Sequence, residues 1–307
     1  MDSAAEYPLE RVISFVKSLA CITRNVTAVV GNPEILQKWI QYQWAIRTGR
    51  EPMLHIGSEV FGGFPHFNAY LGAWKYRPDD SEILFLKRSL RDAMTVLDVG
   101  ANFGVLATLM GEFAPKAKVY AFEPHPQTFA ALKRNVAANR LADRVRCIQS
   151  AVGTAVGTVS FLDTGAPATN RIASPGDHTF EVVLTTIDAF RREHDLTSVD
   201  FLKIDVEGAE LDVLRGAHAS FEKKLIRRGM IEICPGNLKQ FGTSVAELQA
   251  FFAAHSYDLC WYGPQGDAVA AVSAELPEDF LGNAAFMPSQ LDPKARTDLV
   301  DGDVSVN

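Results

Sequence analysis

The sequence has no long hydrophobic run and no layout typical of secretion. No stretch of 18 consecutive apolar residues occurs, so we expect no helix that spans a membrane. Residues 12–20 are moderately apolar, but they follow Glu6, Glu10 and Arg11 and lack the layout of a signal peptide. These features favour a chain that stays in the cytoplasm.

Cysteine is scarce, and its spacing excludes the common cysteine frameworks. The four cysteines form no Cys-x-x-Cys pair and stand far apart, at Cys21, Cys147, Cys234 and Cys260. This pattern indicates buried thiols in a reducing compartment rather than a disulfide or zinc framework. A cytoplasmic location is therefore expected on this ground as well.

Basic residues are not in excess, which argues against one class of partner. The chain of 307 residues carries 30 basic and 37 acidic side chains, a formal net charge of −7. A protein that binds nucleic-acid backbones usually shows a basic face, so we expect no nucleic-acid partner. The hydrophobic fraction of 47% is enough for a sizeable core. The length allows one large α/β domain with additions or two small domains.

Residues 95–124 read as strand, glycine-bearing turn, helix and strand. Residues 95–99 are a short apolar run that suits a buried parallel strand, and residues 105–113 carry apolar side chains at helical spacing. Residues 118–122 form the next expected strand, which Glu123 and Pro124 end. Gly100 and Gly104 allow a tight turn and close approach of a ligand. This is half of a nucleotide-binding α/β fold.

The turn does not match the fingerprint of dinucleotide-binding proteins. That fingerprint is Gly-x-Gly-x-x-Gly, and here position 102 is Asn102. Asp98 stands two positions before the first glycine, where a carboxylate would repel a pyrophosphate. S-adenosylmethionine has no phosphate and carries an ammonium and a sulfonium, so it suits this acid better. A dinucleotide oxidoreductase is therefore disfavoured.

Two further positions are expected to contact that cofactor. Glu123 lies 23 residues after Gly100, where it can accept hydrogen bonds from a ribose diol. Ser150 and Ala151 lie at the tip of the next expected strand, residues 145–152, where polar groups would face the adenine. Taken alone, Asp98 could cap a helix and Glu123 could be a surface acid. Together, at this spacing, they favour the cofactor interpretation.

A second informative stretch is residues 199–210. Residues 201–204 form an expected buried strand, and Asp205 and Glu207 fall at its carboxyl end, where ligands bind in open parallel sheets. Two carboxylates beside Lys203 are costly to bury without a partner. The alternative is that Asp205 caps a helix and Glu210 faces solvent. Glu232 lies inside the next apolar run, residues 228–233, and points either outward or into a site.

Long irregular segments are also predicted. Residues 55–76 are rich in aromatics and glycine, and residues 163–178 read as a loop; either could cover a substrate. Helices are expected over 9–19, 33–48, 78–90, 127–139, 188–193, 209–215 and 244–254. Gly153 and Gly157 indicate a hairpin into a strand at 158–162, and a further strand is expected at 181–185. Strands at 257–262 and 284–287 should pair as an antiparallel edge.

In these residues the chain resembles the FkbM-type family of class I S-adenosylmethionine-dependent methyltransferases. The matching segments are LDVGANFG (97–104), FEP (122–124), NVAAN (135–139), TTIDAF (185–190) and DFLKIDVEGAE (200–210). The resemblance covers roughly residues 76–288. It leaves residues 1–75 as a helical and aromatic extension that could serve as a lid, and residues 289–307 as an expected mobile tail.

The resemblance implies a fold and a set of cofactor contacts. The fold would be a doubly wound, mostly parallel α/β sheet of seven strands in the order 3-2-1-4-5-7-6, with strand 7 antiparallel. The methionine end of the cofactor would lie against Asp98, Gly100, Asn102 and Gly104, with Ala101 and Asp205 beside them. Glu123 and Pro124 would lie at the ribose, and Ser150 and Ala151 at the adenine.

The expected reaction is O-methylation of a hydroxyl on a small molecule such as a sugar or a secondary metabolite. N- or C-methylation and a non-catalytic binding module are the alternatives, and the oligomeric state stays open, a homodimer included. Candidate catalytic residues are Asp205, Glu207, Glu232 and Lys203, with a histidine from residues 55–66 as an outsider. We expect no metal ion, because the fifth strand ends in Glu232-Ile233-Cys234 and not in an Asp-Asn pair.

Overall fold

The computed structural model describes residues 32–162 and 179–289. Three predicted segments lie outside these ranges: the helix over residues 9–19, the loop over residues 163–178 and the tail beyond residue 289. The remaining elements can be compared directly with the expectations.

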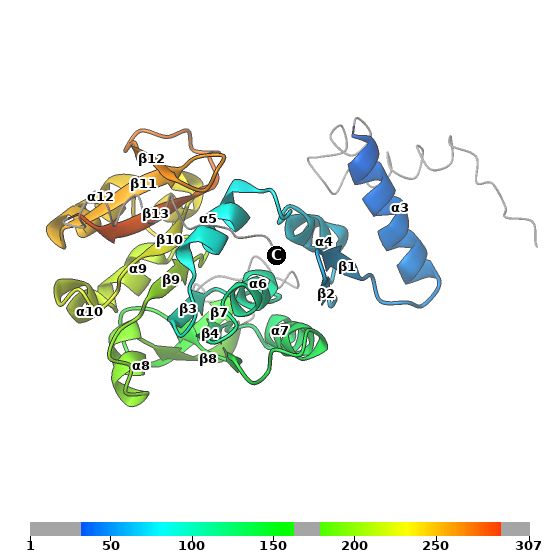
Figure 1. The fold of residues 1–307 in the computed structure, drawn as a ribbon, viewed down its shortest axis with the longest axis horizontal. Coiled ribbons are helices and arrows are strands. Elements are labelled where there is room, and N and C mark those ends of the chain that lie inside the picture. The colour runs from blue at the N-terminus through cyan, green and yellow to red at the C-terminus, as the bar shows by residue number, and fades with distance from the viewer. Residues whose placement is uncertain (1–31, 163–178, 290–307) are drawn as a thin grey trace, which may run out of the picture.

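A mixed sheet of eight strands forms the centre of the molecule (Figure 1). The strands follow the order β12-β11-β13-β10-β9-β3-β4-β5, in which β13 is antiparallel to both β10 and β11. The seven strands from β5 to β11 have the predicted order, and β12, which pairs with β11 at the edge, is an unpredicted addition. Their bounds are β3 Thr95–Val99, β4 Lys118–Phe122, β5 Val145–Ile148, β9 Phe201–Ile204, β10 Gly229–Ile233, β11 Tyr257–Tyr262, β12 Ala268–Ala271 and β13 Gly282–Pro288.

Helices cover both faces of this sheet, because the central strands are apolar on both sides. Residues Val96 and Phe201 face one core, and their strand neighbours Leu97 and Leu202 face the other. The first core also contains residues of α5 Ser81–Ser89, α6 Val105–Phe113 and α7 Pro126–Ala138. The second contains residues of α8 Ile187–Glu193, α9 Glu210–Arg215, α10 His218–Glu222, α11 Pro235–Gln240 and α12 Val245–Ala254.

The region after β5 differs from the prediction of one strand over residues 145–152. The chain turns at Ser150, whose N–H donates to the carbonyl of Ile148, so β6 Ala151–Val152 leaves the central sheet. It joins a separate three-stranded sheet with β8 Thr179–Thr185 and β7 Gly157–Leu162, in the order β6-β8-β7. The predicted hairpin at Gly153 and Gly157 is therefore wrong: β6 and β7 both pair with β8 instead.

The N-terminal segment contains more regular structure than its composition predicted. It forms α3 Pro33–Arg47, a hairpin of β1 Leu54–Ile56 and β2 Glu59–Phe61, and α4 Phe67–Trp74. The hairpin replaces part of the predicted irregular stretch because Gly57 takes the left-handed backbone conformation (φ +62°) that a tight turn needs. On α3, Trp39 and Tyr42 are buried as the helical spacing predicted, whereas Ile46 is exposed.

Two asparagines, one in α7 and one at its C-terminal cap, hold this hairpin against the rest of the molecule. Asn135 accepts from the N–H of Gly62 (2.8 Å) and donates to the carbonyls of Gly62 and Phe103. Asn139 pairs in the same way with both backbone groups of Val60, each at 2.8 Å. Residues of the hairpin and α4 also share the first core. The domain boundary at residue 76 stays a prediction.

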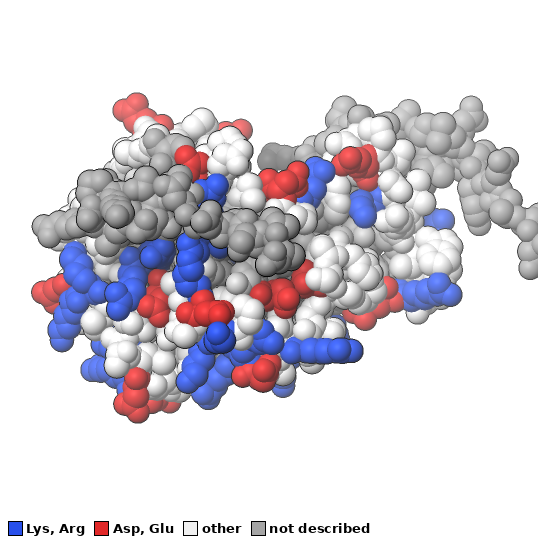
Figure 2. All heavy atoms as spheres, in the orientation of Figure 1, with Lys and Arg blue, Asp and Glu red and all other residues white. Residues whose placement is uncertain are grey.

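The surface shows no strong segregation of charge on the face drawn in Figure 2. Lys and Arg side chains gather toward the lower left of that view, but Asp and Glu side chains lie between them. Within residues 32–162 and 179–289, no helix has the length and apolar character needed to cross a membrane.

Candidate active site

The turn after β3 is built for close approach of backbone. Gly100 has φ +81°, and a Cβ placed on it would lie 1.7 Å from the carbonyl oxygen of Asp205. The N–H groups of Gly100 and Ala101 both donate to the carbonyl of Phe122, at 3.1 and 2.8 Å. Only glycine fits at position 100, because both the conformation and the space exclude a side chain. The turn therefore brings the ends of β3, β4 and β9 together.

Lys203 on β9 lies at the centre of a buried ionic cluster. Its ammonium is 3.3 Å from Oδ1 of Asp98 and 3.1 Å from Oδ2 of Asp205, and it donates to the carbonyl of Gly100 at 3.0 Å. Burial alone would lower the pKa of Lys203, but the carboxylates of Asp205 and Asp98 outweigh it and raise that pKa. Lys203 therefore stays protonated and neutralises part of the carboxylate charge at the strand ends.

Asp98 lies below the surface of the strand ends, and the expectation that it lines the methionine end stays a prediction. Its side chain is fully buried, and it lies in neither of the two cavities described below. It is paired across the sheet with Lys203, two residues before Gly100. Any influence of Asp98 on a ligand therefore acts through Lys203 and the Gly100 turn.

Glu123 follows β4 and is nearly buried. Its Oε2 accepts from the N–H of Asn102 at 3.0 Å, and its Oε1 accepts from the N–H of His125 at 2.9 Å. Burial raises the pKa of Glu123 to about 7, although these two donors oppose the shift. Each carboxylate oxygen has a second lone pair, so the group can still accept hydrogen bonds from a ligand diol.

Two residues at the strand ends have left-handed backbone conformations without being glycine. Asn102 has φ +52° and Glu207 has φ +57°. Glu210 stabilises the second of these turns, because its Oε1 accepts from the N–H groups of Val206 and Gly208, both at 3.1 Å. Glu210 is buried, so the alternative that it faces solvent is wrong. Unusual conformations of this kind cluster at binding sites and active sites.

Two cavities open at the carboxyl ends of the strands. The smaller, of about 140 Å³, is lined by Glu123, Pro124, Ser150, Ala151 and apolar side chains that include Phe122 and Val152. The larger, of about 1310 Å³, extends from the same strand ends to α3, α4 and α5. Residues 65–76 contribute to its wall.

Four residues line both cavities: Gly100, Asn102, Asp205 and Glu207. The two spaces therefore meet at the turn after β3 and the end of β9. Asp205 is partly exposed there, with Lys203 on its buried side, and Glu207 accepts from the side-chain amide of Asn237 at 2.9 Å. A ligand that bridges the two cavities would pass beside these two acids.

The predicted site residues are divided between these surfaces. Ala101, Lys203 and Glu232 line the larger cavity. Ser150 lines the smaller one, but its hydroxyl donates to the carbonyls of Ala151 and Val183. Gly104 lines neither; it begins α6 at φ +81°, and a Cβ there would lie 2.4 Å from the side chain of Leu132. Glycine is required at position 104 because the turn packs directly on α7.

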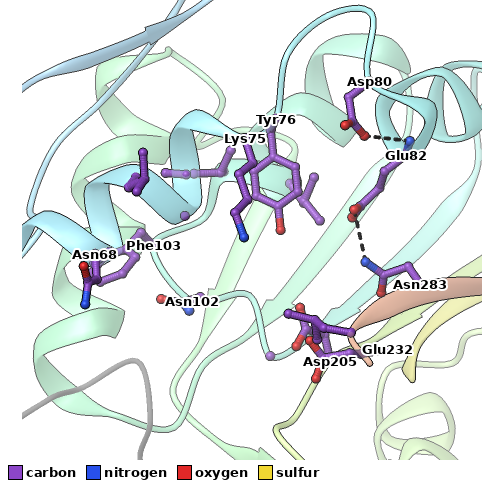
Figure 3. Close-up of a pocket in the computed structure, with 18 of the residues that line it drawn as sticks. Asn68, Lys75, Tyr76, Asp80, Glu82, Asn102, Phe103, Asp205, Glu232 and Asn283 are labelled. Atoms are coloured by element: carbon purple, nitrogen blue, oxygen red, sulfur yellow. Dashed lines mark hydrogen bonds between the residues drawn. The ribbon is translucent and has the colours of Figure 1, made fainter. Parts of the chain in front are cut away.

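Tyr76, Glu82 and Asn283 are polar residues of the larger cavity that the sequence did not reveal (Figure 3). Glu82 lies in the first turn of α5, where an acid is ordinary, and Asn283 lies on a strand whose pairing partner is known only from the fold. Burial, with the carboxyls of Glu82, Asp205 and Glu232, raises the pKa of Tyr76 well above its usual value. No local sequence pattern distinguishes these three side chains.

The strand order of the central sheet defines a class I methyltransferase fold. The sequence profile of the Methyltransferase FkbM domain matches residues 98–259, which is more than half of the chain. The chain therefore belongs to the FkbM methyltransferase family. This confirms the resemblance seen in the motifs around Asp98 and Asp205.

The curated relatives are methyltransferases that act on different acceptors. The chain is 29% identical over 190 residues to a hexuronic acid methyltransferase of Haloferax volcanii, covering 59% of this chain and 74% of that protein. It is 27% identical over 146 residues to a 2-O-methyltransferase of Sinorhizobium fredii, covering 42% and 59% of the two chains. Over 82 residues it is 38% identical to the 31-O-demethyl-FK506 methyltransferase of Streptomyces tacrolimicus, covering 26% and 32%.

Similar solved structures include a precorrin-6y C5,15-methyltransferase from Geobacter metallireducens. It is 12% identical and covers 69% of this chain and 88% of its own, with a TM-score of 0.40. At that TM-score the likeness adds nothing to the strand order described above.

Proposed function

We propose that this protein transfers the methyl group of S-adenosylmethionine to a hydroxyl of a small molecule. The observation that carries the proposal is the meeting of two cavities at Gly100, Asn102, Asp205 and Glu207. One cavity would hold the nucleoside part of the cofactor and the other the acceptor. Their junction is where a donor group and an acceptor can be held in contact.

The residues of the smaller cavity fit this cofactor. Glu123 offers carboxylate oxygens to the ribose diol, and the walls include the apolar side chains of Phe122 and Val152, which suit an adenine ring. The turn at Gly100 leaves no side chain between ligand and backbone. The acids at the junction, Asp205 and Glu207, favour a ligand with positive charge at that point. When bound, S-adenosylmethionine supplies a methyl group on a positively charged sulfur.

The acceptor's proton is the other requirement of the reaction. A neutral alcohol is a poor nucleophile, and a positioned base that takes its proton contributes on the order of 10²–10⁴-fold. Asp205 and Glu232 are the candidate bases, since both line the larger cavity and Asp205 also reaches the junction. Lys203 is held protonated, so we assign it to orienting Asp205 and not to accepting the proton.

O-methylation is favoured over N- or C-methylation by the relatives, which include a 2-O-methyltransferase and a hexuronic acid methyltransferase. The test is transfer of labelled methyl from S-adenosylmethionine to a panel of hexuronic acids, hexopyranosides and matched primary amines. We expect label on hydroxyl acceptors and not on amines. Label on the amines alone would contradict the proposal.

The proposed chemistry needs no metal ion. The reason is the residue order at the end of β10, which is Glu232-Ile233-Cys234 and offers no Asp-Asn pair. We expect methyl transfer to continue in EDTA at the rate seen without chelator. Loss of activity in EDTA that magnesium restores would overturn this expectation and assign Asp205 and Glu232 as ligands.

A further inference from the structure

The larger cavity contains a row of three polar residues, Glu82, Asn283 and Glu232, of which the proposed transfer uses only Glu232. In the sheet register, Glu232 on β10 is directly opposite Asn283 on β13. Side chains directly opposite on neighbouring strands point to the same face of a sheet. Two residues earlier along β10, Met230 faces the core that α5 covers, and so Glu232 and Asn283 face α5 as well.

Glu82 of α5 completes this row from the opposite side. Its Oε2 accepts from the amide nitrogen of Asn283 at 3.0 Å (Figure 3). Its backbone N–H donates to Asp80, the residue that caps α5, at 2.9 Å. Both the helix and β13 therefore fix the position of the carboxyl group. Glu82 lies 201 residues from Asn283 in the sequence, so only the fold brings them together.

Three buried oxygen atoms of this row have no hydrogen-bond partner within the described ranges of the chain. They are Oε1 of Glu82, Oε2 of Glu232 and Oδ1 of Asn283. The side chains of Glu82 and Glu232 are only 9% exposed. Buried polar atoms are paired in the great majority of native structures, and those that are not need a specific explanation. A bound ligand with several hydrogen-bond donors would supply the missing partners.

The chemistry of these atoms defines the ligand groups that fit. The amide oxygen and an unprotonated carboxyl oxygen accept hydrogen bonds, so a ligand group that donates fits these atoms. Burial raises the pKa of Glu82 to about 7, with Asp205 and Asp80 adding to the shift and Lys203 and Asn283 opposing it. Neutral donors such as hydroxyls match acceptors of this kind without adding charge. The cavity wall also contains Trp261 and Phe280, whose rings are 5.3 Å apart and can contact the apolar face of a saturated ring.

We infer that Glu82, Asn283 and Glu232 form an acceptor subsite that binds two neighbouring hydroxyl groups of a polyhydroxylated ring. This subsite deepens, and rests on, the proposed transfer to a hydroxyl. Glu82 accepts from one hydroxyl and Glu232 from the next, while Asn283 positions Glu82. The reacting hydroxyl then lies toward Asp205 and the junction of the cavities.

The experiment compares two probes that differ in hydroxyl number, cis-1,2-cyclohexanediol and cyclohexanol. Their affinities are measured by ligand-observed NMR on the full chain loaded with S-adenosylhomocysteine. The variants are Glu82→Gln, which keeps the shape of the side chain, and Asn283→Ala. Glu112→Gln on the exposed side of α6 is the matched control. Unfolding midpoints and S-adenosylhomocysteine affinity are measured for each variant.

We expect the wild type and Glu112→Gln to bind the diol more tightly than cyclohexanol by about tenfold, the worth of a hydrogen bond to a charged group. Both subsite variants should lose this preference while their affinity for S-adenosylhomocysteine is unchanged. A wild type without diol preference, or variants that keep it, would overturn the subsite. If S-adenosylhomocysteine fails to bind but the diol preference persists and depends on Glu82, the proposed methyl transfer fails and the subsite stands.

Discussion

The two cavities that meet at Gly100 are assembled from the chain in opposite ways. The smaller one is made from short contiguous motifs, such as Glu123-Pro124 and Ser150-Ala151, that follow neighbouring strands of the sheet. The larger one gathers side chains from α3, α4, α5, β10 and β13, which are far apart in the sequence. The proposed cofactor side thus depends largely on local turns, whereas the proposed acceptor side depends on how distant elements pack. Substitutions that change the acceptor can then occur in the larger cavity without disturbing the smaller one.

The largest expected effect is at the turn that both cavities share. Gly100→Ala places a Cβ against the carbonyl of Asp205 in a left-handed conformation, so the end of β9 must move. We expect binding of S-adenosylmethionine to be lost and the unfolding midpoint to fall. Gly157→Ala is the control, because a Cβ at Gly157 meets nothing within 4 Å. Calorimetric titration and thermal unfolding measure both effects, and a Gly100→Ala protein that binds like wild type would refute the turn's role.

Next in size is the separation of chemistry from binding at Asp205. Asp205→Asn keeps the size of the side chain but removes the charge that is paired with Lys203. We expect the rate of transfer to fall by on the order of 10²–10⁴-fold, with a much smaller change in cofactor affinity. Glu232→Gln should have a smaller effect on the rate. Single-turnover rates measure the transfer, and calorimetric titrations measure the cofactor affinity. Full activity in both variants would exclude these two carboxyls as the base. The candidates would then be the histidines, of which His66 lines the larger cavity.

A more moderate effect is expected on the cofactor side alone. Glu123→Ala removes the acceptor for the ribose diol and also leaves the N–H groups of Asn102 and His125 without it. The loss should be about 1–3 kcal/mol, or roughly tenfold or more in affinity for S-adenosylmethionine. Glu112→Ala, an exposed change on α6, is the control. Wild-type affinity in Glu123→Ala would remove Glu123 from the cofactor site.

The smallest effect concerns the acceptor side in the absence of ligand. The pKa of Glu82 is raised from 4.5 to about 7 in the folded protein, so the folded state binds its proton more tightly than the unfolded state does. Its contribution to stability is then full below pH 4.5 and is lost as the pH rises through about 7. Glu82→Gln has no such proton. From pH 5 to pH 8 its free energy of unfolding should therefore rise by about 1–2 kcal/mol relative to that of the wild type. Unfolding midpoints across that range measure the difference; a difference that is constant with pH would contradict the shift.

The sequence predicted β3 and β4 to the residue, because 95–99 and 118–122 are apolar runs bounded by glycine, proline and acids. It did not predict that Asp98 is buried and paired with Lys203, since a residue's depth below the sheet edge depends on strand pairing. It also missed the break at Ser150, whose hydroxyl bonds a carbonyl of the distant β8. Glu82 and Asn283 could not be found, because their contact exists only in the folded chain.

The most direct test of the account is a calorimetric titration of the wild-type protein with S-adenosylmethionine, S-adenosylhomocysteine and NADH. We predict that the first two bind, because Glu123 can accept hydrogen bonds from their ribose diol. We predict that NADH does not bind, because Asp205 and Glu207 beside Gly100 would repel its pyrophosphate. Binding of NADH, or of none of the three, would contradict the cofactor on which the proposed function rests.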